Sequence, residues 1–131
     1  MFSRRRNHQA AERARERRDR EDSAARLRDE VPELTSLRLE VSEFEGDRQI
    51  PEASHIRRIV VEHAPALFLL GCTDQRCVDG GHDLTRDIMR ALRMHQSNFD
   101  GEHVCPGRTG SADCSRRLRY IATASYSNDP S

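Results

Sequence analysis

Four cysteines constrain the fold of this 131-residue chain more than any other feature of its sequence. They form two pairs, Cys72/Cys77 and Cys105/Cys114, and each pair brackets a short segment rich in turn-forming residues. Two such loops can present four thiolates to one tetrahedral zinc ion. Only 35% of the residues are hydrophobic and none is tryptophan, so a metal clamp would add stability that a small apolar core lacks. The spacing therefore predicts a structural zinc site, but it does not by itself predict an activity.

The residues around the cysteines also suit bound thiolates. Arg76, Arg108, Arg116 and Arg117 lie within or beside the two loops, and nearby positive charge lowers the pKa of a thiol. The segment 71–114 resembles two-knuckle zinc-ribbon sites in general, with the wider spacings Cys-x4-Cys and Cys-x8-Cys. This resemblance implies a zinc-binding site and indicates no specific family.

Other assignments of these residues stay open from the sequence. The cysteines could form disulfides or be unrelated thiols, and His82 could replace one of them as a ligand. His82 with Asp79 or Asp83 could also form a catalytic zinc site with an open position. Four cysteines already complete a metal shell, and the zinc-enzyme signatures His-x-Glu…Cys-x-x-Cys and His-Glu-x-x-His do not occur. We therefore expect no enzymatic activity, and we expect His82 to be a turn or cap residue before a helix. Four further histidines are expected at core or edge positions: His55, His63, His95 and His103.

The apolar residues argue against contact with a membrane. The first residues have no apolar stretch typical of a secretory signal, and the longest apolar run, 64–70, contains a proline and is too short to cross a bilayer. We therefore expect a cytoplasmic protein. In a reducing compartment, paired cysteines favour a metal over disulfides.

The formal net charge of zero conceals an uneven distribution. Residues 1–20 contain eight arginines and three acids, whereas residues 29–54 contain eight acids and two arginines. All 22 basic residues are arginine, which suits bidentate contacts to phosphate and carboxylate but also follows from nucleotide composition. We expect a charged arm over residues 1–32, helical or disordered, followed by a zinc-stabilised domain over residues 33–131.

Hydrophobic periodicity predicts an α+β domain in which a small antiparallel sheet packs against one amphipathic helix. Residues 5–30 favour a helix that is polar all round, because its apolar side chains are alanines and Leu27. The amphipathic helix should begin after an N-cap at Asp83 and end at Asp100 and Gly101. Its apolar face should comprise Leu84, Ile88, Leu92, His95 and Phe99. Strands are predicted within residues 37–42, 55–63, 66–70, 102–104 and 118–126.

Two groups of arginines are candidates for nucleic-acid binding. An arginine-rich segment that becomes ordered on binding is a common way to recognise RNA. Solvated or self-paired helix faces would explain the same arginines without a ligand. No pair of aromatic residues suited to base stacking is evident, so backbone contacts should dominate. The candidates are Arg4, Arg5, Arg6, Arg13, Arg15, Arg17, Arg18 and Arg20 in the arm, and Arg86, Arg90 and Arg93 on the amphipathic helix.

The sequence favours a small zinc-stabilised protein that binds RNA or a ribonucleoprotein without strong sequence readout. The main alternative is a protein-interaction or assembly module whose polar arm reaches an acidic partner. A zinc-dependent enzyme is the third hypothesis. No small-molecule substrate is indicated.

Overall fold

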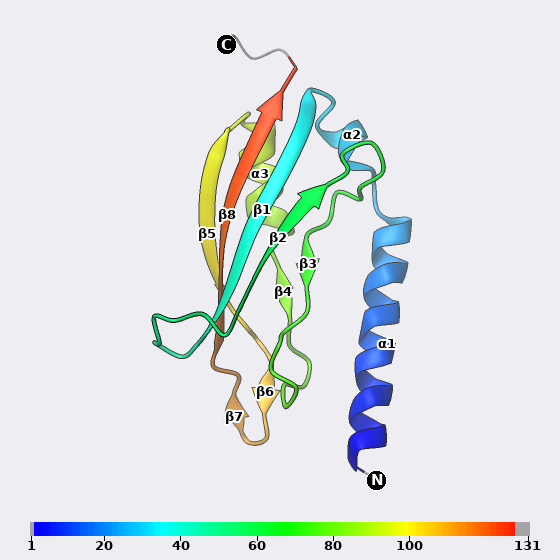
Figure 1. The fold of residues 1–131 in the computed structure, drawn as a ribbon. Helices are drawn as coiled ribbons and strands as arrows, with labels where there is room; N and C mark the ends of the chain where they lie inside the picture. The colour runs from blue at the N-terminus through cyan, green and yellow to red at the C-terminus, as the bar shows by residue number, and fades with distance from the viewer. Residues whose placement is uncertain (1, 128–131) are drawn as a thin grey trace.

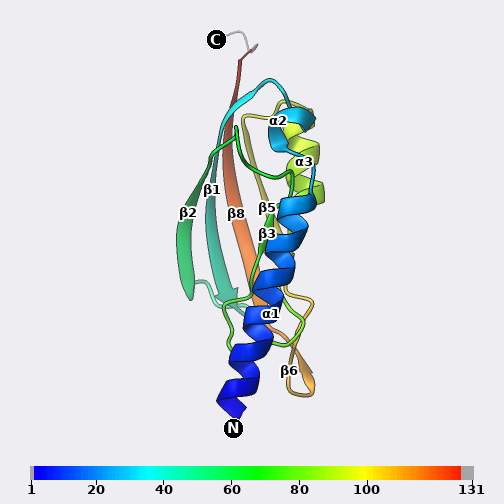
Figure 2. The same cartoon turned by 90° about the vertical axis from the view of Figure 1, so that its right-hand side faces the viewer.

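A four-stranded antiparallel sheet forms the centre of the fold, in the order β2-β1-β8-β5, and the helices lie on one of its faces (Figures 1 and 2). This computed structural model describes the backbone of residues 2–127 and the side chains of residues 11–127. It confirms the predicted combination of helices with a small antiparallel sheet. The helices are α1 (Phe2–Ser23), α2 (Leu27–Glu30) and α3 (Thr85–Arg93). The strands are β1 (Leu34–Glu45), β2 (Ala53–Ile59), β3 (Leu69–Leu70), β4 (His82–Asp83), β5 (Asn98–Val104), β6 (Arg108–Thr109), β7 (Ala112–Asp113) and β8 (Arg116–Tyr126).

The two central strands, β1 and β8, carry the alternation that the sequence predicts. In β1, Leu39 and Val41 are buried, while their neighbours are partly exposed. They pair with Ala122 and Tyr120 of β8, which point to the same face. Because successive side chains of a strand alternate between faces, one face of the sheet becomes apolar along most of its length.

The helix α3 covers this apolar face with a stripe of its own. Ile88 and Leu92 are fully buried, and α2 adds Leu27, which is also fully buried. The remaining buried residues of this core come from β1, β8, α3 and the segments that connect them. They are Val31, Leu34, Leu37, Leu39, Val41, Val61, Phe68, Leu84, Met89, Leu118, Tyr120, Ala122, Ala124 and Tyr126. The core thus includes Leu27 and Val31, which lie before residue 33.

The predicted extension of α3 to residue 99 is wrong. His95 adopts a left-handed backbone with φ of 55°, its N–H donates to Leu92 O, and the N–H of Gln96 donates to Ala91 O. These two bonds form the Schellman motif that ends many helices. Phe99 therefore lies in β5 instead. Asp83 is not the N-cap, which is Leu84, although the Asp83 carboxylate accepts the N–H of Thr85.

Gly101 also lies within β5 and does not end a helix. A Cβ at this position would come within 2.7 Å of the Tyr120 ring, so glycine allows the ring to lie against the backbone. The strands predicted over 55–63 and 66–70 are shorter, since β2 ends at Ile59 and β3 contains only two residues. The chain turns between them, near Pro65, which cannot donate a backbone hydrogen bond to a sheet.

The charged arm is helical, and α1 runs along the side of the domain that carries β3 (Figures 1 and 2). Polar contacts hold it there. The Arg20 guanidinium lies 3.8 Å from an Asp83 carboxylate oxygen, and Arg17 lies beside Gly71. The Arg26 side chain donates to three carbonyls at the end of α1. Within the described residues, no helix combines the length and the apolar character needed to cross a membrane.

Candidate metal centre

The two cysteine loops meet at one end of the sheet, where β6 and β7 form a small hairpin (Figure 1). A backbone bridge joins the loops, because Val78 and Arg108 each donate an N–H to the other's carbonyl, at 2.8 and 3.0 Å. Cys105 follows β5 directly, and its N–H donates to Arg116 O of β8 at 2.9 Å. Cys114 is fixed by an N–H bond to Gly107 O. Backbone hydrogen bonds therefore position Cys105 and Cys114 directly, and the bridge at Val78 holds the chain beside Cys77.

The four sulfur atoms lie within 4.8 Å of one another. The Sγ atoms of Cys72 and Cys114 are 3.8 Å apart, and those of Cys77 and Cys105 are 3.6 Å apart. A tetrahedral zinc with Zn–S bonds of about 2.3 Å requires sulfur separations of roughly 3.8 Å. The four thiols are unpaired by disulfides, and three of them are buried. The cluster can therefore hold one metal ion with little rearrangement.

Two glycines make room for the sulfur atoms. A Cβ at Gly80 would lie 2.2 Å from Cys77 Sγ and 2.6 Å from Cys105 Sγ. A Cβ at Gly107 would lie 2.4 Å from Cys77 Sγ. Real side chains do not approach a sulfur this closely, so each loop needs glycine where it passes the cluster. Gly80 and Gly107 are thus structural parts of the site.

The surroundings of the thiols do not favour four free thiolates. Burial, together with the neighbouring Cys105 and Cys77, raises the pKa of Cys72. Burial and hydrogen bonds with Cys105 and Cys114 raise the pKa of Cys77 to about 12. Burial acts in the same direction on Cys105, but N–H groups, including Gly81 N–H at 3.4 Å, lower its pKa. A cation is therefore needed to hold four deprotonated sulfurs together.

The arginines near the loops do not supply that cation. Arg76 pairs with Asp74 at 3.1 Å, and Arg116 pairs with Glu45 at 3.0 Å. The expectation that nearby arginines lower the thiol pKa values is thus wrong for Cys72 and Cys77, whose pKa values are raised. Carboxylates engage these guanidinium groups instead.

His82 belongs to a second polar network beside the cluster. It is buried in β4, with 2% of its surface exposed, so it is neither a turn residue nor a cap. Its Nε2 lies 3.2 Å from Glu43 Oε1, and its Nδ1 lies 2.8 Å from His103 Nδ1. Both ring nitrogens are therefore engaged away from the sulfur atoms. The metal-ligating cluster among the described residues contains the four cysteines alone.

Glu43 is the buried anion of this network, with 4% of its surface exposed. Burial would raise the pKa of its carboxyl, but hydrogen bonds from His82 and Thr73 lower it below the usual value. Burial and the nearby His82 lower the pKa of His103. The strand alternation that buries Leu39 and Val41 continues to Glu43, and this phase is the signal by which the sequence could have identified the residue.

The candidate nucleic-acid-binding arginines fall into four groups. Arg13 and Arg17 are half-buried on the side of α1 that faces the domain, and Arg20 pairs with Asp83. Arg15 and Arg18 are exposed on α1. The side chains of Arg4, Arg5 and Arg6 lie outside the described residues. Arg86, Arg90 and Arg93 are exposed on α3, and Arg93 pairs with Glu30 at 3.4 Å.

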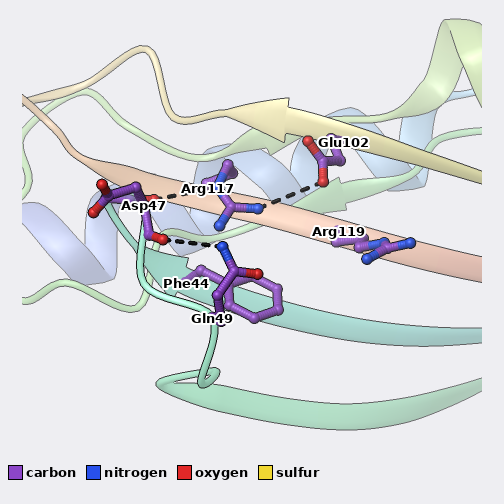
Figure 3. A pocket seen from close by; sticks show the side chains of 7 residues that line it. Phe44, Asp47, Gln49, Glu102, Arg117 and Arg119 are labelled. Carbon is purple, nitrogen blue, oxygen red and sulfur yellow. Dashed lines mark hydrogen bonds and ion pairs between the residues drawn. The ribbon is translucent and has the colours of Figure 1, made fainter.

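A shallow hollow of about 590 Å³ lies on the sheet near the turn after β1 (Figure 3). The Arg117 guanidinium lies over the Phe44 ring, 4.7 Å from its centroid. The same guanidinium donates to the carbonyls of Gly46 and Arg48, and to Glu102. These contacts engage the Arg117 guanidinium and hold the turn after β1 against β8. We assign no ligand to the hollow.

Comparisons with models of known protein families, with curated proteins and with solved structures found no match. A functional assignment therefore depends on the residues themselves. The cluster of four cysteines is the chemically best defined of these features, since it can hold a metal ion through sulfur alone.

Proposed function

We propose that this is a small protein with a structural zinc ion that binds RNA or a ribonucleoprotein through arginines on its helices. Zinc is the proposed metal because four thiolates in a tetrahedral arrangement suit it. Four cysteines fill that shell and leave no position for a reactive water. The metal therefore has a structural role in this proposal, and no enzymatic activity is assigned to it.

The RNA proposal depends on the arginines exposed on the solvent-facing side of α3. Arg86, Arg90 and Arg93 are all exposed there, at spacings of four and three that place them on one face. Arg86 and Arg90 have no ion pair with any described residue, so their guanidinium groups are available to phosphates.

The contacts should be made to the phosphate backbone rather than to bases. Phe44 is covered by Arg117, and Phe99 packs edge-on against Tyr120 inside the sheet. Neither ring is free to stack on a base. Arginines that contact phosphates give affinity that depends on salt and little on sequence.

The test is binding of a fluorescent twelve-nucleotide RNA of mixed sequence by the whole protein, measured at several salt concentrations. The triple variant R86Q/R90Q/R93Q should bind more weakly and lose about two from the slope of log affinity against log salt, because each phosphate contact contributes roughly 0.7 for a single strand. A matched control, R48Q/R57Q/R58Q, removes three arginines near or on β2, away from α3, and should change the slope little. Binding that is absent, or that does not depend on salt, would contradict the proposal.

A protein-interaction module is the second candidate, and the open face of the sheet favours it. Ile56 and Ile121 flank Glu40 on neighbouring strands, and 52% and 48% of their surfaces are exposed. Exposed apolar side chains on one face can mark a contact with another protein. Sedimentation over a wide concentration range would support this candidate if the protein associated without nucleic acid. A strictly monomeric protein would count against self-association.

A further inference from the structure

A second cavity, of about 390 Å³, lies between α1 and the end of the sheet that holds the cysteine loops. Its volume falls in the range of roughly 300–1,000 Å³ typical of small-molecule sites. The walls combine three arginines, three acids and two histidines with the two glycines that follow the first cysteine loop. The lining residues are Arg13, Glu16, Arg17, Arg20, Leu69, Leu70, Asp79, Gly80, Gly81, His82, Asp83, His103 and Pro106.

We infer that this cavity binds one ribose-phosphate unit of RNA. The inference rests on the proposed function and narrows it, because it names the part of the nucleic acid that enters the protein. The inference depends on a separate observation. Arginines and carboxylates that form no ion pair with a described residue line the same cavity, and the cavity has the volume of a nucleotide site.

Arg13 and Arg17 are the phosphate-binding groups. Both are half-buried on the domain side of α1, and neither forms an ion pair with a described residue. A planar guanidinium binds two phosphate oxygens at once, and partial burial strengthens such a contact. Arg20 is different, since its guanidinium is already paired with Asp83.

Glu16 and Asp79 would repel a phosphate placed against them, and they therefore indicate a ligand that also carries hydroxyl groups. Carboxylates accept hydrogen bonds from ribose hydroxyls, as they do in dinucleotide-binding sites. Asp83 is unsuited to this role because Arg20 and the N–H of Thr85 engage it. The three arginines and three acids give the lining a formal charge of zero. Such a lining suits a ligand that carries both a phosphate and hydroxyl groups better than it suits a bare anion.

His103 connects the cavity to the buried network. Its Nδ1 is bonded to His82, while no described residue bonds its Nε2. His103 therefore adds a polar group to the cavity wall, because one of its ring nitrogens has no partner among the described residues.

The experiment uses the whole protein and two probes, adenosine 5′-monophosphate and its 2′-deoxy counterpart, with binding measured by NMR titration. We expect the ribonucleotide to bind at least about tenfold more tightly, since a hydrogen bond to a charged group contributes about that much. R13Q/R17Q should weaken ribonucleotide binding by about tenfold or more. The matched control R15Q/R18Q removes two arginines from the exposed side of the same helix and should change it less than about twofold.

A second variant tests the carboxylate without disturbing α1. Asp79→Gly removes an exposed side chain at a residue whose φ is 58°, a conformation that glycine adopts freely. It should reduce the preference for ribose without weakening the binding of the deoxynucleotide, since it removes a carboxylate that would repel the phosphate. Circular dichroism and the zinc content of each variant establish that it is folded.

Four results would overturn parts of the assignment. Equal affinity of the wild type for the two nucleotides, or equal losses in R13Q/R17Q and R15Q/R18Q, would remove the cavity as a ribose-phosphate site. If the twelve-nucleotide RNA binds, and loses affinity only when the α3 arginines are replaced, the proposed function stands and the cavity inference fails. If only the mononucleotide binds, the RNA-binding function fails and the cavity is a free-nucleotide site.

Discussion

The two ends of the sheet are held together by different chemistry. At the end near α2 and α3, one face of β1 and β8 is covered by apolar side chains such as Ile88 and Leu92. At the other end the same face meets the cysteine cluster and the Glu43–His82–His103 network. The change occurs at one row of the sheet, where Leu118 pairs with Glu43 on one side and with His103 on the other. Burial of apolar surface stabilises the first end, whereas metal–sulfur bonds and buried hydrogen bonds would stabilise the second.

The two ends therefore tolerate different kinds of substitution. An apolar core loses stability in proportion to the area and volume removed, and it tolerates small changes. A metal cluster or a buried polar chain fails when one member is lost, because the remaining members stay buried without their partners. Loss of a ligand or of a buried polar partner should therefore be tested against truncation of an apolar side chain.

Loss of one sulfur should have the largest effect. Cys105→Ser removes a buried ligand, and we expect loss of the metal with destabilisation of roughly 5 kcal/mol or more, since structural zinc contributes about 10–16 kcal/mol of apparent binding free energy in small zinc domains. Urea unfolding and zinc analysis of the purified protein measure both quantities.

Chelation of the wild type is the control for this substitution. A strong chelator should reproduce the destabilisation of Cys105→Ser and should have little further effect on that variant. Purified protein with less than about a tenth of a zinc per chain and four freely reactive thiols would contradict the metal assignment, because a structural site binds close to one equivalent.

Replacement of Ile88 by alanine tests the apolar end. Ile88 is fully buried, and truncation of such a side chain costs about 3 kcal/mol through lost burial and the cavity that remains. The zinc content should stay at its wild-type value, because the cysteine loops lie at the opposite end. Loss of zinc in Ile88→Ala would show that the two ends are not independent.

The sequence predicted the structure correctly where a periodic pattern of residues was not interrupted by an unusual backbone conformation. The alternation in β1 and β8 and the cysteine pairing predicted the central strands and the cluster of four sulfurs. The end of α3 could not be found in this way, because Phe99 continues the apolar spacing although His95 has already turned the backbone. A left-handed residue other than glycine leaves little trace in a hydrophobic pattern.

The polar network was missed for a different reason. His82 and His103 are far apart in the sequence and meet through the pairing of β5 with β8 and the position of β4. The alternation assigns Glu43 to the inner face, but a charged residue at the end of an apolar strand is more often exposed. Only the three-dimensional arrangement shows that His82 and Thr73 compensate its charge.

Glu43→Gln tests whether that compensation stabilises the metal end. The substitution keeps the shape of the side chain but removes the charge that accepts hydrogen bonds from His82 and Thr73. We therefore expect the free energy of unfolding to fall by about 2 kcal/mol at pH 7. The pKa of Glu43 is lowered in the folded protein, so its contribution is fully present above the unfolded pKa and is lost as the pH falls through the folded pKa.

The pH dependence separates this explanation from a packing defect. The difference in unfolding free energy between wild type and Glu43→Gln should be constant from pH 7 to about pH 5, above the unfolded pKa of about 4.3, and should narrow below it. A difference that persists unchanged at low pH would show that shape, and not charge, is responsible.

The smallest predicted effect lies at the apolar end, where a side-chain hydrogen bond is added to packing. The Tyr126 hydroxyl donates to Gln96 O at 2.7 Å, and its ring stacks on His95 with centroids 4.5 Å apart. Tyr126→Phe keeps the ring and removes the hydroxyl, so a loss of about 1 kcal/mol is expected in urea unfolding. Because packing rather than a chain of polar bonds holds this end, the effect should be smaller than that of Glu43→Gln at pH 7. An equal or larger loss would mean that the end of β8 depends on polar contacts as strongly as the metal end does.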